Sequence, residues 1–294
     1  MPDKVSRRGF IAVAGAAGAG VALAATIGAL SKRPEAKFAA QLRAVRRDGA
    51  LPAEDPASDE WLRADPILVK LVPQQVAQPF LGELDVPELS VEALHNGEEL
   101  AFRLGWDDPD VDDLDALNVF RDAAAVQLPT QLGGTPPPIM MGGPGVPVHI
   151  LQWRASWQRD LGGRTGVEDI YPNVVRDETP DRVLPGGVAQ LFYVGRVVGN
   201  PLSVEQRTTS VEEVIAEGFG TATSLAEQRA RGGGVSGNGR WTATIGFPME
   251  RAPAGARLEP GSVWPVAFAV WQGGKGNRGS RKQFADWIDL ELEA

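Results

Sequence analysis

The sequence predicts an all-β protein: an immunoglobulin-like β-sandwich with long loop insertions and a few short helices. Three observations support this fold class. Glycine (35 residues) and proline (23 residues) make up nearly a fifth of the 294-residue chain, a composition that disfavours a mainly helical protein. Short apolar or alternating segments recur between turn signals. The pairs Asn96-Gly97 and Asn238-Gly239 match the sequence preference of tight hairpin turns.

The expected strands are short and are spread over most of the chain. They comprise residues 67–72, 99–106, 119–128, 148–153, 241–247, 263–271 and 287–292. Helical patterning is scarce, and its best examples are residues 224–231 and part of 211–216. Residues 156–205 are rich in Gly, Pro and Asp, and we interpret them as a long insertion between core strands.

The first 33 residues resemble an export signal that includes an N-terminal hydrophobic helix. Arg7-Arg8 stands directly before the uncharged run 10–30, which is typical of twin-arginine (Tat) signals. As a helix, these 21 residues would be about 31 Å long, enough to span a bilayer. We therefore expect export by the Tat route, to the periplasm or the outer face of the cytoplasmic membrane. Cleavage within 22–24 and retention of 10–30 as a membrane anchor both remain open.

The remainder of the chain divides into a tether and one domain. Residues 34–58 are predicted to be a tether with a short amphipathic helix, because Phe38, Leu42 and Val45 are spaced at i, i+4 and i+7. Its last part is a spacer rich in Pro, Ala and acidic residues. Residues 59–294 are predicted to form the β-sandwich domain.

Composition excludes several classes of function. The chain has no Cys and only two His, which excludes disulfides, iron–sulfur clusters, thiolate metal sites and a His-rich metal centre. The net charge is −9, and because residues 1–33 carry +4, the remainder carries −13. Such an acidic body repels phosphate backbones, so we expect no nucleic-acid binding. It suits a basic protein partner or simple solubility.

Motifs for catalysis are scarce. His149 shares a strand face with Leu151 and Trp153 and is interpreted as a core histidine, whereas His95, beside a hairpin turn, is expected to be exposed. Neither accompanies a nucleophile motif, which disfavours a Ser-His-Asp hydrolase. The acidic run 107–113 lacks the Gly and the terminal Glu of an EF-hand, and we interpret it as a solvated loop.

Two Gly-rich segments are better candidates for a binding site. Residues 140–148 begin with Met140-Met141 and lead into the strand that ends at Trp153. Residues 271–282 begin with a Trp and end with Arg281-Lys282. Loops at the end of a rigid sandwich commonly carry the groups that bind ligands.

Several motifs in these regions resemble the haem-binding gamma subunits of class II dimethyl-sulfoxide-reductase-family molybdoenzymes. This family includes ethylbenzene dehydrogenase, dimethylsulfide dehydrogenase, and selenate and chlorate reductases. The matching stretches are residues 94–106, 120–129, 141–153, 216–221, 238–241 and 266–271. They follow the family's order and extend over most of residues 61–294.

The resemblance implies one b-type haem held between a Met sulfur and a Lys amine. It places Met141, in the motif Met-Gly-x-x-Gly-x-Pro-Val, as one axial ligand, with its neighbour Met140 as the rival. For the amine it favours Lys282, with Lys275 as the rival. Residues 59–294 contain only three Lys and three Met, so few other choices exist. An amine must lose its proton to bind iron, which burial would favour.

The resemblance also implies contacts and partners. Arg154, Arg278 and Arg281 are candidates to pair with haem propionates, and Trp153, Phe268 and Trp271 are candidates to pack against the porphyrin. With both axial positions filled, the protein would transfer electrons and catalyse nothing. Its partners would be an iron–sulfur beta subunit, a molybdenum-containing alpha subunit, and a quinone or cytochrome c as external carrier. The competing hypothesis is a cofactor-free exported binding module for a glycan or protein ligand.

Overall fold

A computed structural model of the chain describes residues 37–174, 194–204, 206–251 and 254–294. The described part is mostly β-strand with a few short helices, as predicted. The expected N-terminal hydrophobic helix and signal segment lie outside the described residues. Within the described ranges, no helix has the length and apolar character needed to cross a membrane.

The strands and helices alternate little along the chain, because the helices cluster in one insertion. The strands are β1 (Lys37–Phe38), β2 (Gln41–Arg46), β3 (Ile67–Lys70), β4 (Val72–Pro73), β5 (Glu88–His95), β6 (Glu99–Asp107), β7 (Ala123–Pro129), β8 (Val148–Arg154), β9 (Val211–Ala216), β10 (Thr223–Ser224), β11 (Arg231–Gly237), β12 (Arg240–Pro248), β13 (Val263–Trp271), β14 (Gln283–Phe284) and β15 (Ile288–Leu292). The helices are α2 (Ala155–Asp160), α3 (Val167–Ile170) and α4 (Val194–Val197), with 3₁₀ turns η2 (Asp59–Arg63), η5 (Pro201–Ser203) and η6 (Gly273–Lys275).

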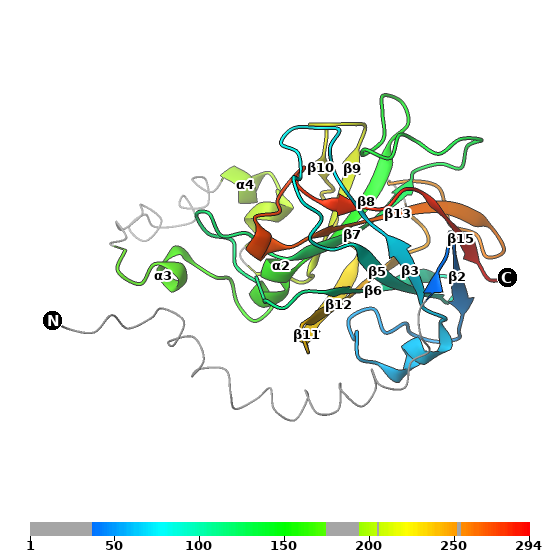
Figure 1. The fold of residues 1–294 in the computed structure, drawn as a ribbon, viewed down its shortest axis with the longest axis horizontal. Coiled ribbons are helices and arrows are strands. Elements are labelled where there is room, and N and C mark those ends of the chain that lie inside the picture. Colours follow the sequence, from blue (N-terminus) through cyan, green and yellow to red (C-terminus); the bar gives the residue numbers. More distant parts are fainter. Residues whose placement is uncertain (1–36, 175–193, 205, 252–253) are drawn as a thin grey trace.

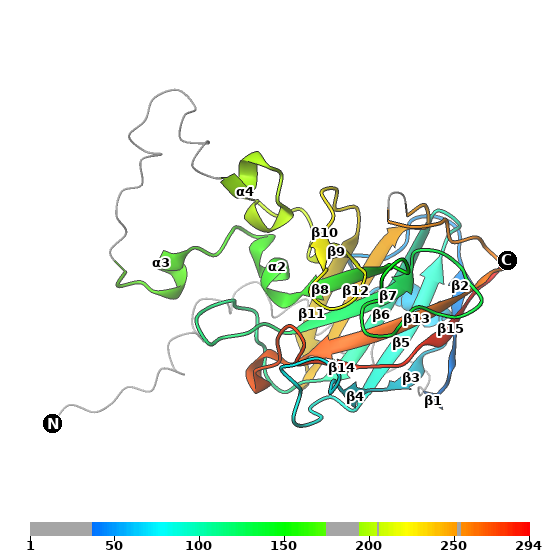
Figure 2. The same ribbon diagram turned by 90° about the horizontal axis from the view of Figure 1, so that it is seen from above.

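Eleven of these strands form one hydrogen-bonded path in the order β10-β9-β8-β7-β13-β15-β2-β5-β6-β12-β11, and β1, β3, β4 and β14 pair beside it. Strand β13 joins two layers of this path, because residues 263–266 pair with β15 in one layer and residues 267–271 pair with β7 in the other. The path folds so that β6 packs across β8 and β13, as in the contacts Trp106–Trp153 (6.1 Å between ring centroids) and Phe102–Phe268 (6.0 Å). Helices α2, α3 and α4 gather at the end of the molecule opposite the C-terminus (Figures 1 and 2).

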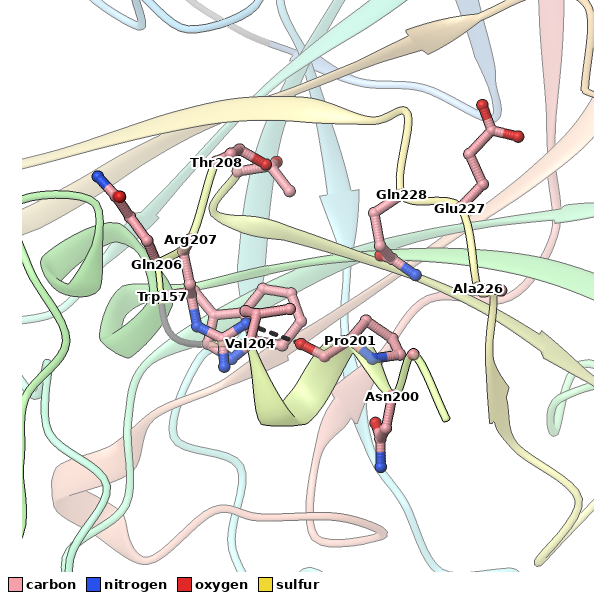
Figure 3. Close-up of a pocket in the computed structure, with 12 residues that line it drawn as sticks. Trp157, Asn200, Pro201, Val204, Gln206, Arg207, Thr208, Ala226, Glu227 and Gln228 are labelled. Atoms are coloured by element: carbon pink, nitrogen blue, oxygen red, sulfur yellow. Dashed lines mark hydrogen bonds between the residues drawn. The ribbon is translucent and has the colours of Figure 1, made fainter. Parts of the chain in front are cut away.

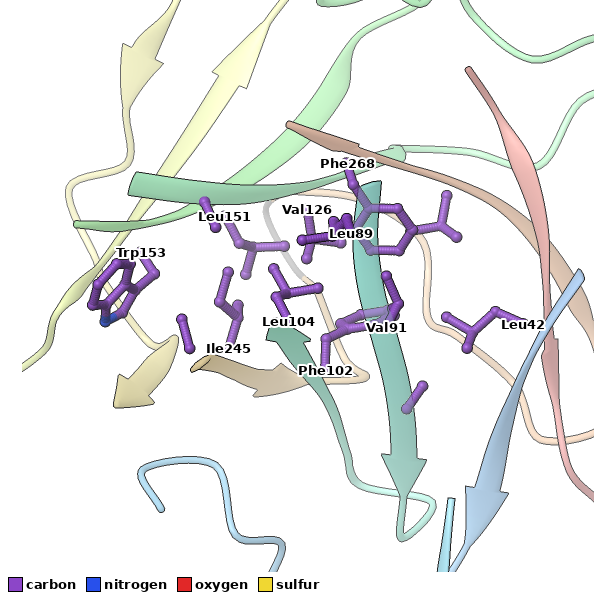
Figure 4. Close-up of a cluster of buried hydrophobic side chains, with 14 of the residues drawn as sticks. Leu42, Leu89, Val91, Phe102, Leu104, Val126, Leu151, Trp153, Ile245 and Phe268 are labelled. Atoms are coloured by element: carbon purple, nitrogen blue, oxygen red, sulfur yellow. The ribbon is translucent and has the colours of Figure 1, made fainter. Parts of the chain in front are cut away.

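The core fills the space between the two layers (Figure 4). Its side chains alternate along each strand, so that Leu151 and Trp153 of β8 point inward while Gln152 and Arg154 are only partly buried on the other face. This period of two is the pattern that predicted the strands. The hairpin at Asn238-Gly239 is a two-residue turn with both φ angles positive (54° and 72°), as expected for an Asn-Gly type I′ turn.

Strand β11 is a strand that the sequence analysis missed, because it contains Gly232-Gly233-Gly234. Glycine is depleted in strands in general. Here the absence of side chains is required by close packing: a Cβ at Gly234 would lie 2.1 Å from Trp153, and one at Gly233 would lie 2.2 Å from the Glu54 carbonyl oxygen.

The amphipathic helix expected within 34–58 is wrong. Phe38 lies in β1, and Leu42 and Val45 lie in β2, which pairs in parallel with β15 and β5. Leu42 and Ala44 are buried while Gln41 and Arg43 are exposed, which is the alternation of a strand. The sheet therefore includes residues before 59, where the sequence analysis placed the start of the domain.

Three smaller expectations also need correction. Residues 211–216 form β9 rather than helix, because β8 and β10 supply hydrogen-bond partners on both sides, and residues 224–231 are likewise not helical. His95 is fully buried rather than exposed, and its backbone pairs with Arg46 at the end of β2. In the acidic run 107–113, Asp108 is fully buried rather than solvated.

Candidate functional site

A cavity of about 500 Å³ lies on the outer face of β8 and β9, away from the core. This volume is within the range of ~300–1,000 Å³ that is usual for ligand sites. Its wall includes Ile150, Gln152 and Arg154, which occupy alternate positions of β8, and Trp271 at the end of β13. A smaller hollow beside it shares Met140, Ile150, Trp271 and Lys282 and has a floor of small residues: Ala125, Ala267 and Ala269.

The methionine loop, residues 140–148, reaches the cavity from one side. Met140 and Met141 both line it. Met141 has a left-handed backbone (φ 66°), and its carbonyl oxygen accepts a hydrogen bond from Gly218 N (2.8 Å). The next residue must be glycine, because a Cβ at Gly142 would lie 2.7 Å from the Val146 carbonyl oxygen. These contacts fix the loop against the end of β9.

The lysine loop, residues 271–282, reaches the same cavity from another side. Lys282 lies in the cavity wall directly before β14, and its backbone carbonyl accepts from Gln74 N (3.0 Å). Its Nζ lies 5.3 Å from the centre of the Trp271 ring, and Trp271 Nε1 donates to the Gly279 carbonyl (2.9 Å). Burial lowers the pKa of the Lys282 amine from 10.5 to about 8. No hydrogen bond or ion pair of this amine is found among the described residues.

The structure distinguishes between the two candidate lysines but not between the two candidate methionines. Lys275 is exposed on η6 and does not line the cavity, which leaves Lys282 as the lysine that faces the two methionines. Met140 and Met141 both remain at the cavity wall, so geometry does not choose between them. The third methionine outside the signal segment, Met249, is fully buried in the core.

Arg154 and Glu212 form an ion pair on the cavity wall, and Ser224 Oγ donates a hydrogen bond to Glu212. Burial and then the nearby Arg121 lower the pKa of Arg154 to about 9. Arg121 also lines the cavity and pairs with Asp115 (2.5 Å). Together these groups give the wall two guanidinium groups and one amine against a single carboxylate, a balance that favours an anionic ligand.

The other predicted contacts lie elsewhere. Trp153 is not in the cavity: it points to the opposite face of β8 and packs in the core against Trp106 and Trp241 (6.1 and 5.1 Å). Phe268 likewise packs on Phe102 in the core. Neither ring lines the cavity of about 500 Å³, although Phe268 is among the residues of the smaller hollow beside it. Arg281 adjoins Lys282 without lining the cavity, and its buried Nε has no hydrogen-bond partner among the described residues.

Sequence reasoning missed Arg121, Glu212, Leu202 and Phe219, which also line the cavity. Glu212 was hidden because its strand was read as helix. Leu202 comes from the insertion and has no periodic neighbours that would have placed it. Gln152 could have been found, because it shares the face of β8 with Arg154.

A second cavity, of about 550 Å³, lies beside α2 and η5 (Figure 3). Its wall contains Trp157, which the Arg207 guanidinium covers at 3.6 Å from the ring centre. Arg207 also donates to the Pro201 carbonyl (3.3 Å). The Gln228 amide is occupied by backbone groups of Glu213 and Leu225. Its polar groups thus serve the local structure, and we place the candidate site in the first cavity.

Comparisons with known proteins agree with the motifs. A family model described as ethylbenzene dehydrogenase matches residues 58–179. A protein of Haloferax mediterranei named as the ORF7 heme subunit of a respiratory nitrate reductase is 24% identical over 80% of this chain and 66% of its own length. The chlorate reductase subunit gamma of Ideonella dechloratans is 26% identical over 44% of this chain and 59% of its own length. The chain thus spans less than two thirds of the length of each relative.

Among solved structures, a family 9 carbohydrate-binding module from Caldicellulosiruptor kristjanssonii in complex with glucose gives a TM-score of 0.39 at 6% identity, over 86% of this chain and 96% of that one. A protein from Bacteroides uniformis described as carbohydrate-binding gives a TM-score of 0.43 at 9% identity, over 86% of this chain and 99% of that one. The family model and the two named relatives therefore point in the same direction as the motifs: the chain is similar to a heme subunit and to a gamma subunit of reductases.

Proposed function

We propose that this protein is a non-catalytic electron-transfer subunit that binds one b-type haem in the cavity between the methionine and lysine loops. A single observation carries the proposal. Met140, Met141 and Lys282 come from segments about 140 residues apart in the sequence and line the same cavity of about 500 Å³. The names of the relatives, a heme subunit and a reductase gamma subunit, support it independently.

The chemistry of the donor set fits a haem iron. Lys282 would provide one axial ligand and Met141 the other, with Met140 as the alternative. An amine binds a metal only without its proton, and burial has already lowered the pKa of Lys282 to about 8. A bound haem b would supply the one-electron chemistry of its iron, and a thioether ligand raises its potential. With Lys282 and a methionine both holding the iron, the haem would transfer electrons and would not bind a substrate.

The remaining cavity residues fit the rest of the group. Arg154 and Arg121 would pair with the carboxylates of haem, with Arg281 and Arg278 as further candidates from the lysine loop. The side chains of Ala125 and Ala269, which line the smaller hollow, are small, and Trp271 would pack against the ring. Glu212 would hold Arg154 in place.

The partners follow from the resemblance. We propose that an iron–sulfur beta subunit and a molybdenum-containing alpha subunit assemble with this chain, and that a quinone or cytochrome c is the external carrier. Because the chain has no Cys, its partners would supply the clusters. Export by the Tat route, with residues 10–30 as a possible anchor, is part of the same proposal.

An absorption spectrum of the purified full chain, with and without added haem, tests the proposal. We expect a Soret band and a sharp α band on reduction, typical of six-coordinate haem. Lys282→Ala should give a five-coordinate spectrum or lose the haem, and so should the change of the methionine that is the ligand. Lys275→Ala, a matched change in the same loop, should leave the spectrum unchanged.

The single variants Met141→Ala and Met140→Ala decide between the two methionines. An unchanged spectrum in Lys282→Ala would exclude this lysine as the ligand. A protein that stays colourless after haem is added would contradict the whole proposal and would favour a cofactor-free binding module.

A further inference from the structure

Two buried carboxyl groups, Asp108 and Asp122, lie where the acidic loop (residues 107–113) crosses the start of the lysine loop. Both residues are fully buried. Asp108 follows β6, and Asp122 precedes β7, next to the cavity residue Arg121. The site proposed above for haem uses neither of them.

Asp122 accepts three hydrogen bonds. Its Oδ1 accepts from Gly273 N (2.8 Å), which belongs to the segment between Trp271 and Lys282. Its Oδ2 accepts from Asp112 N (2.8 Å) and from the indole Nε1 of Trp241 (2.9 Å). Three N–H donors favour the ionised form of a carboxyl group.

Asp108 has a different set of neighbours. Its Oδ1 accepts from the Gln272 amide (3.0 Å) and from Asp110 N (3.2 Å). Its Oδ2 is buried and receives no hydrogen bond from the described residues. The Asp122 carboxyl lies within hydrogen-bonding reach of the Asp108 carboxyl. One proton shared by the two carboxyl groups would give this unpartnered oxygen a hydrogen bond with Asp122.

The charges around the pair are mainly negative. Besides burial, the negative charge of Asp112 raises the pKa of Asp122. Burial and then the charges of Asp108, Asp110 and Asp113 in the same loop in turn raise the pKa of Asp112. The lysine loop faces the pair with an amide and a backbone N–H, and β6 and β12 face it with the indoles of Trp106 and Trp241. Burial, followed by the charge of Asp108, raises the pKa of Asp122 to about 7, and burial raises the pKa of Asp108.

We infer that one proton shared by Asp108 and Asp122 fastens the lysine loop to the acidic loop, so that the cavity wall carrying Trp271 and Lys282 is tightened by protonation. While the proton is held, one carboxyl group donates to the other, and the pair holds Gln272 and Gly273 on one side and Asp110 and Asp112 on the other. Loss of the proton leaves two carboxylates facing each other in a buried place. Their repulsion loosens the bonds to Gly273 and Asp112.

Hydrogen exchange of the full chain without added haem tests this clamp directly. The amide hydrogens of Gly273 and Asp112 report on it, because both donate to Asp122. After correction for intrinsic exchange, their protection should fall about tenfold or more between about pH 6 and about pH 8.5, the range over which the shared proton is lost.

Asp108→Asn supplies the decisive comparison. The Asn amide donates to Asp122 as the protonated acid would, but it cannot ionise. Protection of Gly273 and Asp112 in this variant should therefore stay within about twofold over the same pH range. Asp110→Asn removes an exposed acid of the same loop and should behave like the unchanged protein. Equal loss of protection in Asp108→Asn and in the unchanged protein would overturn the inference.

A second measurement applies if Asp108→Asn does not fold. A carbon-13 NMR titration of the Asp carboxyl groups in the unchanged chain should show one group that titrates near neutrality. Titration of every Asp below about pH 5 would contradict a shared proton.

The effect on the cofactor rests on the proposed function and is read separately. In the haem-loaded protein, the rate of haem loss should rise with pH in the unchanged chain and stay flat in Asp108→Asn. Exchange results that support the clamp in a protein that binds no haem would uphold this inference and reject the proposed function.

Discussion

Strands β8 and β9 carry a polar pair on each of their two faces, and the two pairs have different surroundings. On the inner face, His149 Nε2 and a Glu213 carboxylate oxygen lie 3.1 Å apart, and each side chain is 1% exposed. On the outer face, Arg154 pairs with Glu212 in the wall of the cavity. The His149 ring lies 6.2 Å from the ring of Phe247, a residue of the same apolar core cluster as Leu151 and Trp153, which Figure 4 shows.

The difference shows how one pair of strands serves both stability and binding. Burial lowers the pKa of His149, although the hydrogen bond and charge of Glu213 act in the opposite direction. The inner pair therefore contains a neutral imidazole, which the core tolerates better than a cation. The outer pair keeps a charged guanidinium beside open space. Changes on the inner face should alter folding, and changes on the outer face should alter ligand affinity.

Trp153→Ala should have the largest effect on stability. The side chain is fully buried and packs against Trp106 and Trp241, so its loss should lower the free energy of unfolding by about 3–5 kcal/mol. Urea unfolding followed by circular dichroism measures this. If the folded variant binds haem with unchanged affinity, Trp153 contributes to the core alone. A loss of haem affinity without a loss of stability would contradict the comparison.

The inner pair should make stability depend on pH. Because the pKa of His149 is lowered in the folded chain, the unfolded chain binds more protons near its ordinary value of 6.5. Stability should therefore fall as the pH drops through about 6.5 and below. His149→Gln can still donate to Glu213 and should lack this component. The difference between the two unfolding curves across a pH series measures it; parallel curves would show that His149 does not contribute.

Glu212→Gln should have the smallest effect, and only on the outer face. The amide keeps a contact with Arg154 but removes the charge, which weakens a charge-assisted hydrogen bond by about 1 kcal/mol. Haem dissociation should become about fivefold faster while the unfolding midpoint changes little. The exposed Glu217 provides the control as Glu217→Gln. A large loss of stability in Glu212→Gln would place this residue in the structural set instead.

The sequence predicted most of the core strands because they alternate and have clear turns. Residues 263–271 were predicted with the bounds that the structure has, and 148–153 missed only Arg154. The failures include β11, which was missed because of its three glycines, and two strands, β2 and β9, that were read as helix. Strand β2 was read as helix because Leu42 and Val45 also fit a helical spacing, and only its parallel pairing with β5 and β15 decides for a strand.

The candidate site likewise depended partly on local sequence and partly on the tertiary structure. The sequence by itself singled out Met141 and Lys282 by their motifs, and it fixed the absence of cysteine and the local turns. Only the tertiary structure brought the two loops to one cavity, excluded Lys275 and Trp153 from it, and added Arg121 and Glu212. The physical reason is that turn geometry and side-chain alternation depend on neighbours in the chain, whereas a cavity depends on which strands pair and which face each side chain takes.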